Sequence, residues 1–224
     1  KIRDLETLIT PRVARRIVKQ RPEVINRDQA GVAVRLETLR RALPDLDPTL
    51  IVLAYPTILT VRPELILSKI AALRRIFPSH DPAKLLAKKP AFFGRDLSEN
   101  GTVVTTIHRL AELLPNVRDM TQMIARNPSI LGLNFDDTIK VRVQRWKELL
   151  PGLNFDAMVD KQPTVLTLGL DNVVLKLHIL SRTTNTSQSE LAHLVETRPV
   201  LMTFSPGRYG RLLYIAGPHY ALVG

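Results

Sequence analysis

Tyr55-Pro56-Thr57-Ile58-Leu59 contains one of six copies of a motif in which a proline is followed by one variable and two apolar residues. The prolines of the six copies are Pro22, Pro56, Pro90, Pro128, Pro163 and Pro199. Successive copies are 34, 34, 38, 35 and 36 residues apart. The motif alone also occurs by chance, as at Pro63-Glu64-Leu65-Ile66, so the regular spacing is what predicts a repeat protein.

A second helix stop lies between the copies. It reads Leu43-Pro44, Phe77-Pro78, Leu114-Pro115 and Leu150-Pro151, and Asn185 takes its place in the next repeat. Proline cannot continue a helix, because it lacks the backbone N–H and clashes with the preceding turn, and asparagine also suits a helix end. Two stops per repeat predict two helices per repeat.

The longer helix of each repeat carries one apolar stripe, as in Val32, Leu36, Leu39 and Leu43. The shorter helix begins at Asp47-Pro48 and again at Asp81-Pro82, an N-cap acceptor followed by proline in the first turn. It ends just before the motif, which we expect to form a tight 3₁₀ turn with its apolar residues in the core.

These elements predict an all-α fold. We expect a curved superhelical solenoid of about six repeats, each of two helices and a 3₁₀ turn, because stacked repeats share a continuous core. No flexible linker interrupts the pattern, so we expect a single domain over residues 1–224.

The composition points to a polyanionic partner. With 32 Lys+Arg against 21 Asp+Glu, the net charge is +11 and the isoelectric point about 10.3. The absence of cysteine excludes disulfides, Cys-ligated metals and thiol catalysis. The longest apolar run, Leu50–Val61, is too short to span a bilayer, so no membrane association is expected. The chain begins at Lys1 rather than Met, which leaves room for a removed transit peptide.

No catalytic or cofactor motif is recognisable. The five histidines are scattered over different repeats, and neither a P-loop nor a GxSxG or HExxH stretch occurs. We therefore expect no enzyme activity, no metal and no cofactor.

The pattern of repeats resembles the mitochondrial transcription termination factor (mTERF) family, from about Pro11 to Gly217. The features that carry the resemblance are the regular proline motifs and the Leu-Pro pairs between them. It implies a left-handed superhelix whose basic concave face binds double-stranded DNA, with RNA as the alternative. It also implies an organellar regulator or terminator of transcription that acts as a monomer in the mitochondrion, or alternatively in the chloroplast. A scaffold for RNA or a protein partner in organellar ribosome biogenesis is the second hypothesis.

Cations recur at one phase of the longer helices. At about 100° per residue, Arg35, Lys69, Arg142 and Lys176 lie about 60° from the apolar stripe, and Thr106 interrupts the row. Arg109 and Arg145 occupy the neighbouring position. A second, weaker row on the opposite flank holds Arg40, Arg74 and Lys147. We expect the first row to contact nucleic acid, although which row faces the concave side stays open.

Both ends of the chain are also basic. Residues 1–43 hold 11 Lys+Arg and 5 Asp+Glu, with Arg12, Arg15, Arg16 and Lys19 in the first helix. Arg208 and Arg211 follow the last motif, and such clusters suit phosphates. The candidate nucleic-acid-binding residues are Arg35, Lys69, Arg109, Arg142, Arg145, Lys176, Arg208 and Arg211.

Aromatic residues are scarce, which favours a duplex over a single strand. Single-strand binders stack bases on exposed aromatic rings. Only Tyr209, Tyr214 and Tyr220 are candidates for such stacking, and a packed C-terminal cap accounts for them equally well.

Overall fold

The computed structural model describes residues 2–26, 28–205 and 207–209, and every regular element in these ranges is helical. This confirms the all-α prediction. The chain divides into two compact units, residues 1–107 and 108–224. The single domain and the curvature of a continuous solenoid stay predictions.

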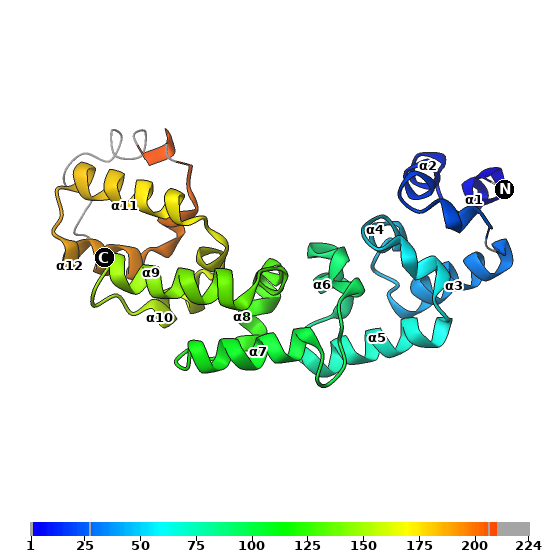
Figure 1. Cartoon of the computed structure of the whole chain (residues 1–224), viewed down its shortest axis with the longest axis horizontal. Helices are drawn as coiled ribbons and strands as arrows, with labels where there is room; N and C mark the ends of the chain where they lie inside the picture. The colour runs from blue at the N-terminus through cyan, green and yellow to red at the C-terminus, as the bar shows by residue number, and fades with distance from the viewer. Residues whose placement is uncertain (1, 27, 206, 210–224) are drawn as a thin grey trace. The chain divides into compact units, whose positions relative to one another are not determined.

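The first unit holds the first three proline motifs (Figure 1). Its elements are α1 (Ile2–Leu8), α2 (Pro11–Gln20), η1 (Pro22–Asn26), α3 (Gln29–Ala42), α4 (Pro48–Ala54), η2 (Pro56–Thr60), α5 (Pro63–Ile76), α6 (Pro82–Lys88), η3 (Pro90–Gly94) and the start of α7 (Thr102–Leu113).

The second unit holds the remaining three motifs. After the end of α7, its elements are α8 (Met120–Arg126), η4 (Pro128–Gly132), η5 (Phe135–Lys140), α9 (Val141–Leu149), α10 (Phe155–Lys161), η6 (Pro163–Thr167), α11 (Leu170–Thr184), α12 (Gln188–Thr197) and η7 (Pro199–Thr203).

All six proline motifs form five-residue 3₁₀ helices, as predicted. Their apolar residues enter the core: Ile58, Leu59, Phe92 and Phe93 are at most 3% exposed. A large apolar side chain contributes about 1.5–3 kcal/mol when it is fully buried. Each 3₁₀ helix is therefore anchored in the core. Counted from one proline motif to the next, a repeat begins with its 3₁₀ helix and continues with a long and a short helix, so that η1, α3 and α4 form the first repeat.

The helix ends also follow the predicted stops. Leu43, Phe77 and Leu150 are the C-cap residues of α3, α5 and α9. Asn185 ends α11 in the left-handed conformation at φ 49°, which asparagine tolerates better than most residues. Asp47 and Asp81 accept hydrogen bonds from backbone N–H groups in the first turns of α4 and α6, as expected of N-caps.

Like elements pack on like elements within each unit. In the first unit, α3 packs on α5, and α2 packs on α4 (Figure 1). In the second unit, α9 packs on α11, α10 on α12, and η6 on both η4 and η7. In these pairs long helices stack on long helices and short helices on short ones, and in the second unit the 3₁₀ helices also stack on one another.

One local feature departs from the predicted pattern. The fourth long helix begins as the π-helical turn η5 before it continues as α9. Two consecutive amides, those of Thr138 and Ile139, donate to the carbonyl of Asn134 at 3.1 Å. The Asn134 side chain also accepts from the Asp137 amide, so one residue organises the turn.

Candidate nucleic-acid interface

The first predicted row of cations lies on the long helices, and each member donates to a main-chain carbonyl of the following repeat. Arg35 of α3 donates through Nε to the carbonyl of Val61, which follows η2. Lys69 of α5 donates through Nζ to Arg95 at 2.7 Å, just after η3. Arg35 and Lys69 therefore do lie at the predicted phase, but their charged groups are already hydrogen-bonded to main-chain carbonyls.

The second unit repeats this arrangement. Arg142 donates through Nη1 to the carbonyl of Leu166 in η6 at 2.9 Å, and Lys176 through Nζ to Met202 in η7 at 2.6 Å. Lys176 is only 2% exposed. Burial lowers the pKa of Lys176, because a desolvated ammonium is less stable than a hydrated one.

The prediction that Lys176 contacts nucleic acid therefore needs correction. A phosphate can reach an ammonium only across exposed surface, and the Lys176 side chain offers almost none. Lys69, Arg35 and Arg142 are half-buried. Burial also lowers the pKa of Lys69, an effect that the nearby Asp96 carboxylate partly offsets. The helical phase correctly placed the four cations on one flank, but it did not show what lies opposite them.

The two neighbouring candidates, Arg109 and Arg145, are paired with carboxylates. Arg109 forms an ion pair with Asp136, and its guanidinium lies 3.9 Å from the centre of the Phe135 ring. The hydrogen bond from Arg109 lowers the pKa of the Asp136 carboxyl. Arg145 pairs with Glu148 at 3.0 Å on the exposed side of α9. Both arginines remain reachable by a phosphate, which would have to compete with the carboxylate.

At the C-terminal end, Arg208 is exposed, and its guanidinium lies 4.6 Å from the centre of the Phe204 ring. Arg211, Tyr214 and Tyr220 lie outside the described residues. Tyr209 is 1% exposed and donates its hydroxyl hydrogen bond to the carbonyl of Leu201. Tyr209 is therefore part of a packed cap and not a base-stacking platform.

Burial raises the pKa of Tyr209 to about 12, so this group is expected to make stability fall at alkaline pH. Above about pH 10, the unfolded tyrosine ionises while the folded one keeps its proton, and the unfolded state is favoured until about pH 12. Tyr209→Phe lacks this contribution, so its free energy of unfolding should fall less between pH 9 and pH 11. Urea unfolding of the parent protein and of Tyr209→Phe at pH 9 and pH 11 measures these free energies. An equal fall in the two proteins would contradict a role for Tyr209.

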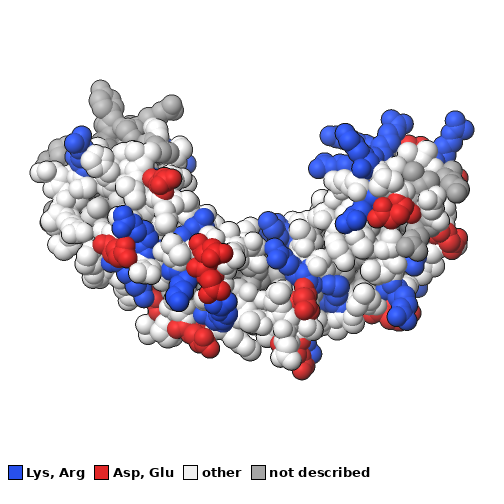
Figure 2. Space-filling model, in the orientation of Figure 1, with Lys and Arg blue, Asp and Glu red and all other residues white. Residues whose placement is uncertain are grey.

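An exposed cluster of cations lies on α2, outside the eight candidate residues, although the sequence already indicated that it suits phosphates. Arg12, Arg15, Arg16 and Lys19 follow one another at i, i+3, i+4 and i+7 on α2, and all four are exposed. The opposite face of α2 buries Ala14 and Ile17. We call these four residues the α2 cationic face; Figure 2 shows Lys and Arg gathered over this part of the first unit. Among the described residues, only Arg15 of the four has an ion pair, with Glu6 at 3.2 Å.

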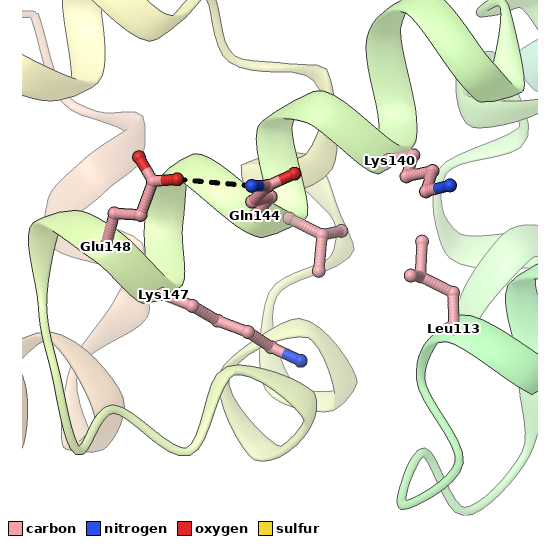
Figure 3. Close-up of a pocket in the computed structure, with 6 residues that line it drawn as sticks. Leu113, Lys140, Gln144, Lys147 and Glu148 are labelled. Carbon is pink, nitrogen blue, oxygen red and sulfur yellow. Dashed lines mark hydrogen bonds between the residues drawn. The ribbon is translucent and has the colours of Figure 1, made fainter.

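A shallow groove of about 440 Å³ lies between the end of α7 and α9 in the second unit. Its walls are Leu113, Lys140, Val143, Gln144, Lys147 and Glu148. Gln144 donates to Glu148 at 3.3 Å, while Lys140 and Lys147 extend from α9 and the turn before it (Figure 3). Lys147, a member of the second predicted row, is thus a surface residue of this groove.

Comparison with known protein families identifies the repeat. The mTERF family model matches residues 6–211, which include all six proline motifs. The chain belongs to the mTERF family. This family consists of organellar helical-repeat proteins and points to nucleic-acid binding. A comparison with curated proteins gave no match.

The net charge of this mTERF chain is uneven along its length. Residues 1–107 hold 19 Lys+Arg against 11 Asp+Glu, and residues 108–224 hold 13 against 10. Most of the excess positive charge therefore belongs to the unit that contains α2. In the part of the mTERF chain that the structure describes, no His, Asp and Glu cluster could hold a metal ion. None of the described helices is long and apolar enough to cross a membrane.

Proposed function

We propose that this mTERF protein binds double-stranded DNA as a monomer and regulates or terminates transcription in an organelle, without catalysing a reaction. We place it in the mitochondrion, with the chloroplast as the alternative. The α2 cationic face is the observation that carries the proposal, because its four cations are exposed and only one of them has an ion pair with a described residue.

The dimensions of this face suit a nucleic-acid backbone. Arg12 and Lys19 are seven residues apart, which is about 10.5 Å along a helix. One strand of B-DNA carries a phosphate for about every 3.4 Å of its axis, so α2 could span about three phosphates. Arginine and lysine contacts of this kind hold a protein on the backbone, whereas base edges supply sequence preference.

The aromatic residues support a duplex rather than a single strand. No aromatic side chain among the described residues is exposed, and the largest ones, Trp146 and Tyr209 among them, are fully packed. Since the described residues offer no exposed ring on which a base could stack, their affinity for nucleic acid has to come from the backbone, whose charge density is highest in a duplex.

The test is a salt titration with duplex DNA, matched duplex RNA and single-stranded DNA of the same sequence. If about 6 to 10 phosphates are contacted, the logarithm of the affinity for duplex DNA should fall with the logarithm of salt at a slope of about −5 to −9. Tighter binding to duplex RNA would redirect the proposal to RNA. A slope near zero, or no binding at low salt, would overturn nucleic-acid binding.

A further inference from the structure

The four cations of the long helices have the same kind of hydrogen-bond acceptor as well as the same helical phase. Arg35, Lys69 and Lys176 each donate to the carbonyl 26 residues further along the chain, and Arg142 to the carbonyl 24 residues further along. The acceptors lie in the last part of a 3₁₀ helix or directly after it. Each bond therefore joins the long helix of one repeat to the 3₁₀ helix of the next.

The chemistry of the acceptors explains why cations occupy this position. The last carbonyls of a helix have no partner within that helix and carry partial negative charge. A lysine or arginine that reaches them from the preceding repeat satisfies an otherwise unpaired acceptor. A hydrogen bond from a charged donor is also stronger than one between neutral groups.

Cations on the short helices of the second unit also donate to carbonyls near the end of a helix in the next repeat. Arg126 at the end of α8 donates to the carbonyls of Asp160 and Lys161 at the end of α10. Lys161 in turn donates through Nζ to the carbonyl of Glu196 near the end of α12, at 3.0 Å. Two independent layers of this unit are thus tied from one repeat to the next by a cation on a helix C-terminus.

The one position of the row without a cation is also linked to the following repeat. Thr106 occupies the row position in α7, and its hydroxyl donates to Thr102 within the same helix. Arg109, one turn later in α7, instead pairs with Asp136 and covers Phe135 in η5. Where the usual cation is missing, a neighbouring one makes the connection to the following repeat through a carboxylate.

We propose that Arg35, Lys69, Arg142 and Lys176 are inter-repeat clamps, a conformational device that fixes each 3₁₀ helix to the preceding long helix, and that they are not phosphate contacts. In each clamp, the side chain of the cation donates to a carbonyl at the end of the next repeat's 3₁₀ helix or directly after it. This assignment goes beyond nucleic-acid binding and does not depend on it.

The experiment compares Arg142→Met and Lys176→Met with Lys147→Met and Arg182→Met, which remove exposed cations from the same two helices. Methionine keeps most of the apolar chain and removes the donor. Unfolding in urea is followed by the fluorescence of Trp146, the single tryptophan, which is buried in α9. Hydrogen exchange is measured in η6 for Arg142 and in η7 for Lys176.

Loss of a clamp should raise the unfolding equilibrium constant about tenfold or more, because a buried acceptor loses its partner. Amides of the matching 3₁₀ helix should exchange about tenfold faster, while the controls stay within about twofold of the parent. Arg142→Lys should have the stability and exchange rates of the parent protein, since Lys69 and Lys176 make the equivalent hydrogen bond through a lysine. Failure of Arg142→Met to fold while Arg142→Lys folds would also support the clamp.

Two results would overturn the inference. One is unchanged stability and exchange in both methionine variants. The other is a fall of about one unit per variant in the salt slope of duplex binding, which is the signature of a lost phosphate contact. Absence of DNA binding in the parent protein would leave the stability and exchange results fully interpretable.

Discussion

Replacing Arg12, Arg16 and Lys19 together by alanine is expected to weaken duplex DNA binding about 10²-fold at 0.1 M salt and to reduce the salt slope by about three units. Each residue is exposed on α2 and among the described residues has no carboxylate in ion-pair contact. Each phosphate contact contributes about 0.9 to the slope, so three lost contacts change both quantities together. Fluorescence anisotropy of a labelled duplex, repeated over a range of salt concentrations, measures both.

The matched control removes three other cations from the same unit. Arg40, Arg41 and Arg75 are exposed on α3 and α5 and lie near carboxylates, Glu37 for the first two and Glu99 for the third. Their replacement by alanine gives the same change in formal charge, but it should alter the slope by less than one unit. Equal losses in both triple variants would mean that net charge alone drives binding. Circular dichroism should show that α2 remains helical, since alanine is the strongest helix former.

Phe155→Ala should lower the free energy of unfolding by about 3–5 kcal/mol, the cost usually seen when a buried phenylalanine is truncated. Phe155 is 2% exposed at the start of α10, and its ring centre lies 5.9 Å from that of Trp146 in α9. The substitution leaves a cavity at the junction of a long and a short helix. Urea unfolding followed by Trp146 fluorescence should show a midpoint lower by about 2 M with little change in slope.

Phe135→Ala is the comparison for this prediction. Phe135 lies in η5 of the same unit, but it is only half-buried and is covered by the Arg109 guanidinium. Its loss should cost about 1 kcal/mol, since a partly exposed ring leaves no closed cavity. A cost for Phe155→Ala as small as that expected for Phe135→Ala would show that Phe155 is not a central packing residue of this unit.

Much of the fold could be predicted because proline acts locally. The motif at Pro56 becomes a 3₁₀ helix, and the pair Leu43-Pro44 ends α3, since a missing N–H has the same effect in any tertiary context. The turn η5 could not be predicted in this way. In η5, the amides of Thr138 and Ile139 both donate to the carbonyl of Asn134. Neither the proline positions nor the apolar periodicity indicates this arrangement.

The candidate site was harder to predict because helical phase describes one helix at a time. It correctly placed Arg142 and Lys176 on one flank, but the acceptors at Leu166 and Met202 belong to another repeat. The α2 cationic face, by contrast, had a signal in the sequence. The spacing of Arg12, Arg15, Arg16 and Lys19 puts four cations on one side of a helix, and this could have been preferred over a row with one cation per repeat.

The inter-repeat clamps have a direction, and this matters for anyone who wishes to lengthen or shorten the array. A long helix supplies the donor, and the 3₁₀ helix that comes after it in the chain supplies the acceptor. A module cut from one proline motif to the next would therefore keep a carbonyl whose donor lies in the preceding repeat. It would also keep a cation whose acceptor lies in the following repeat. Consensus repeats built from this protein should keep a lysine or arginine at the position of Lys176, even where the design calls for a neutral surface.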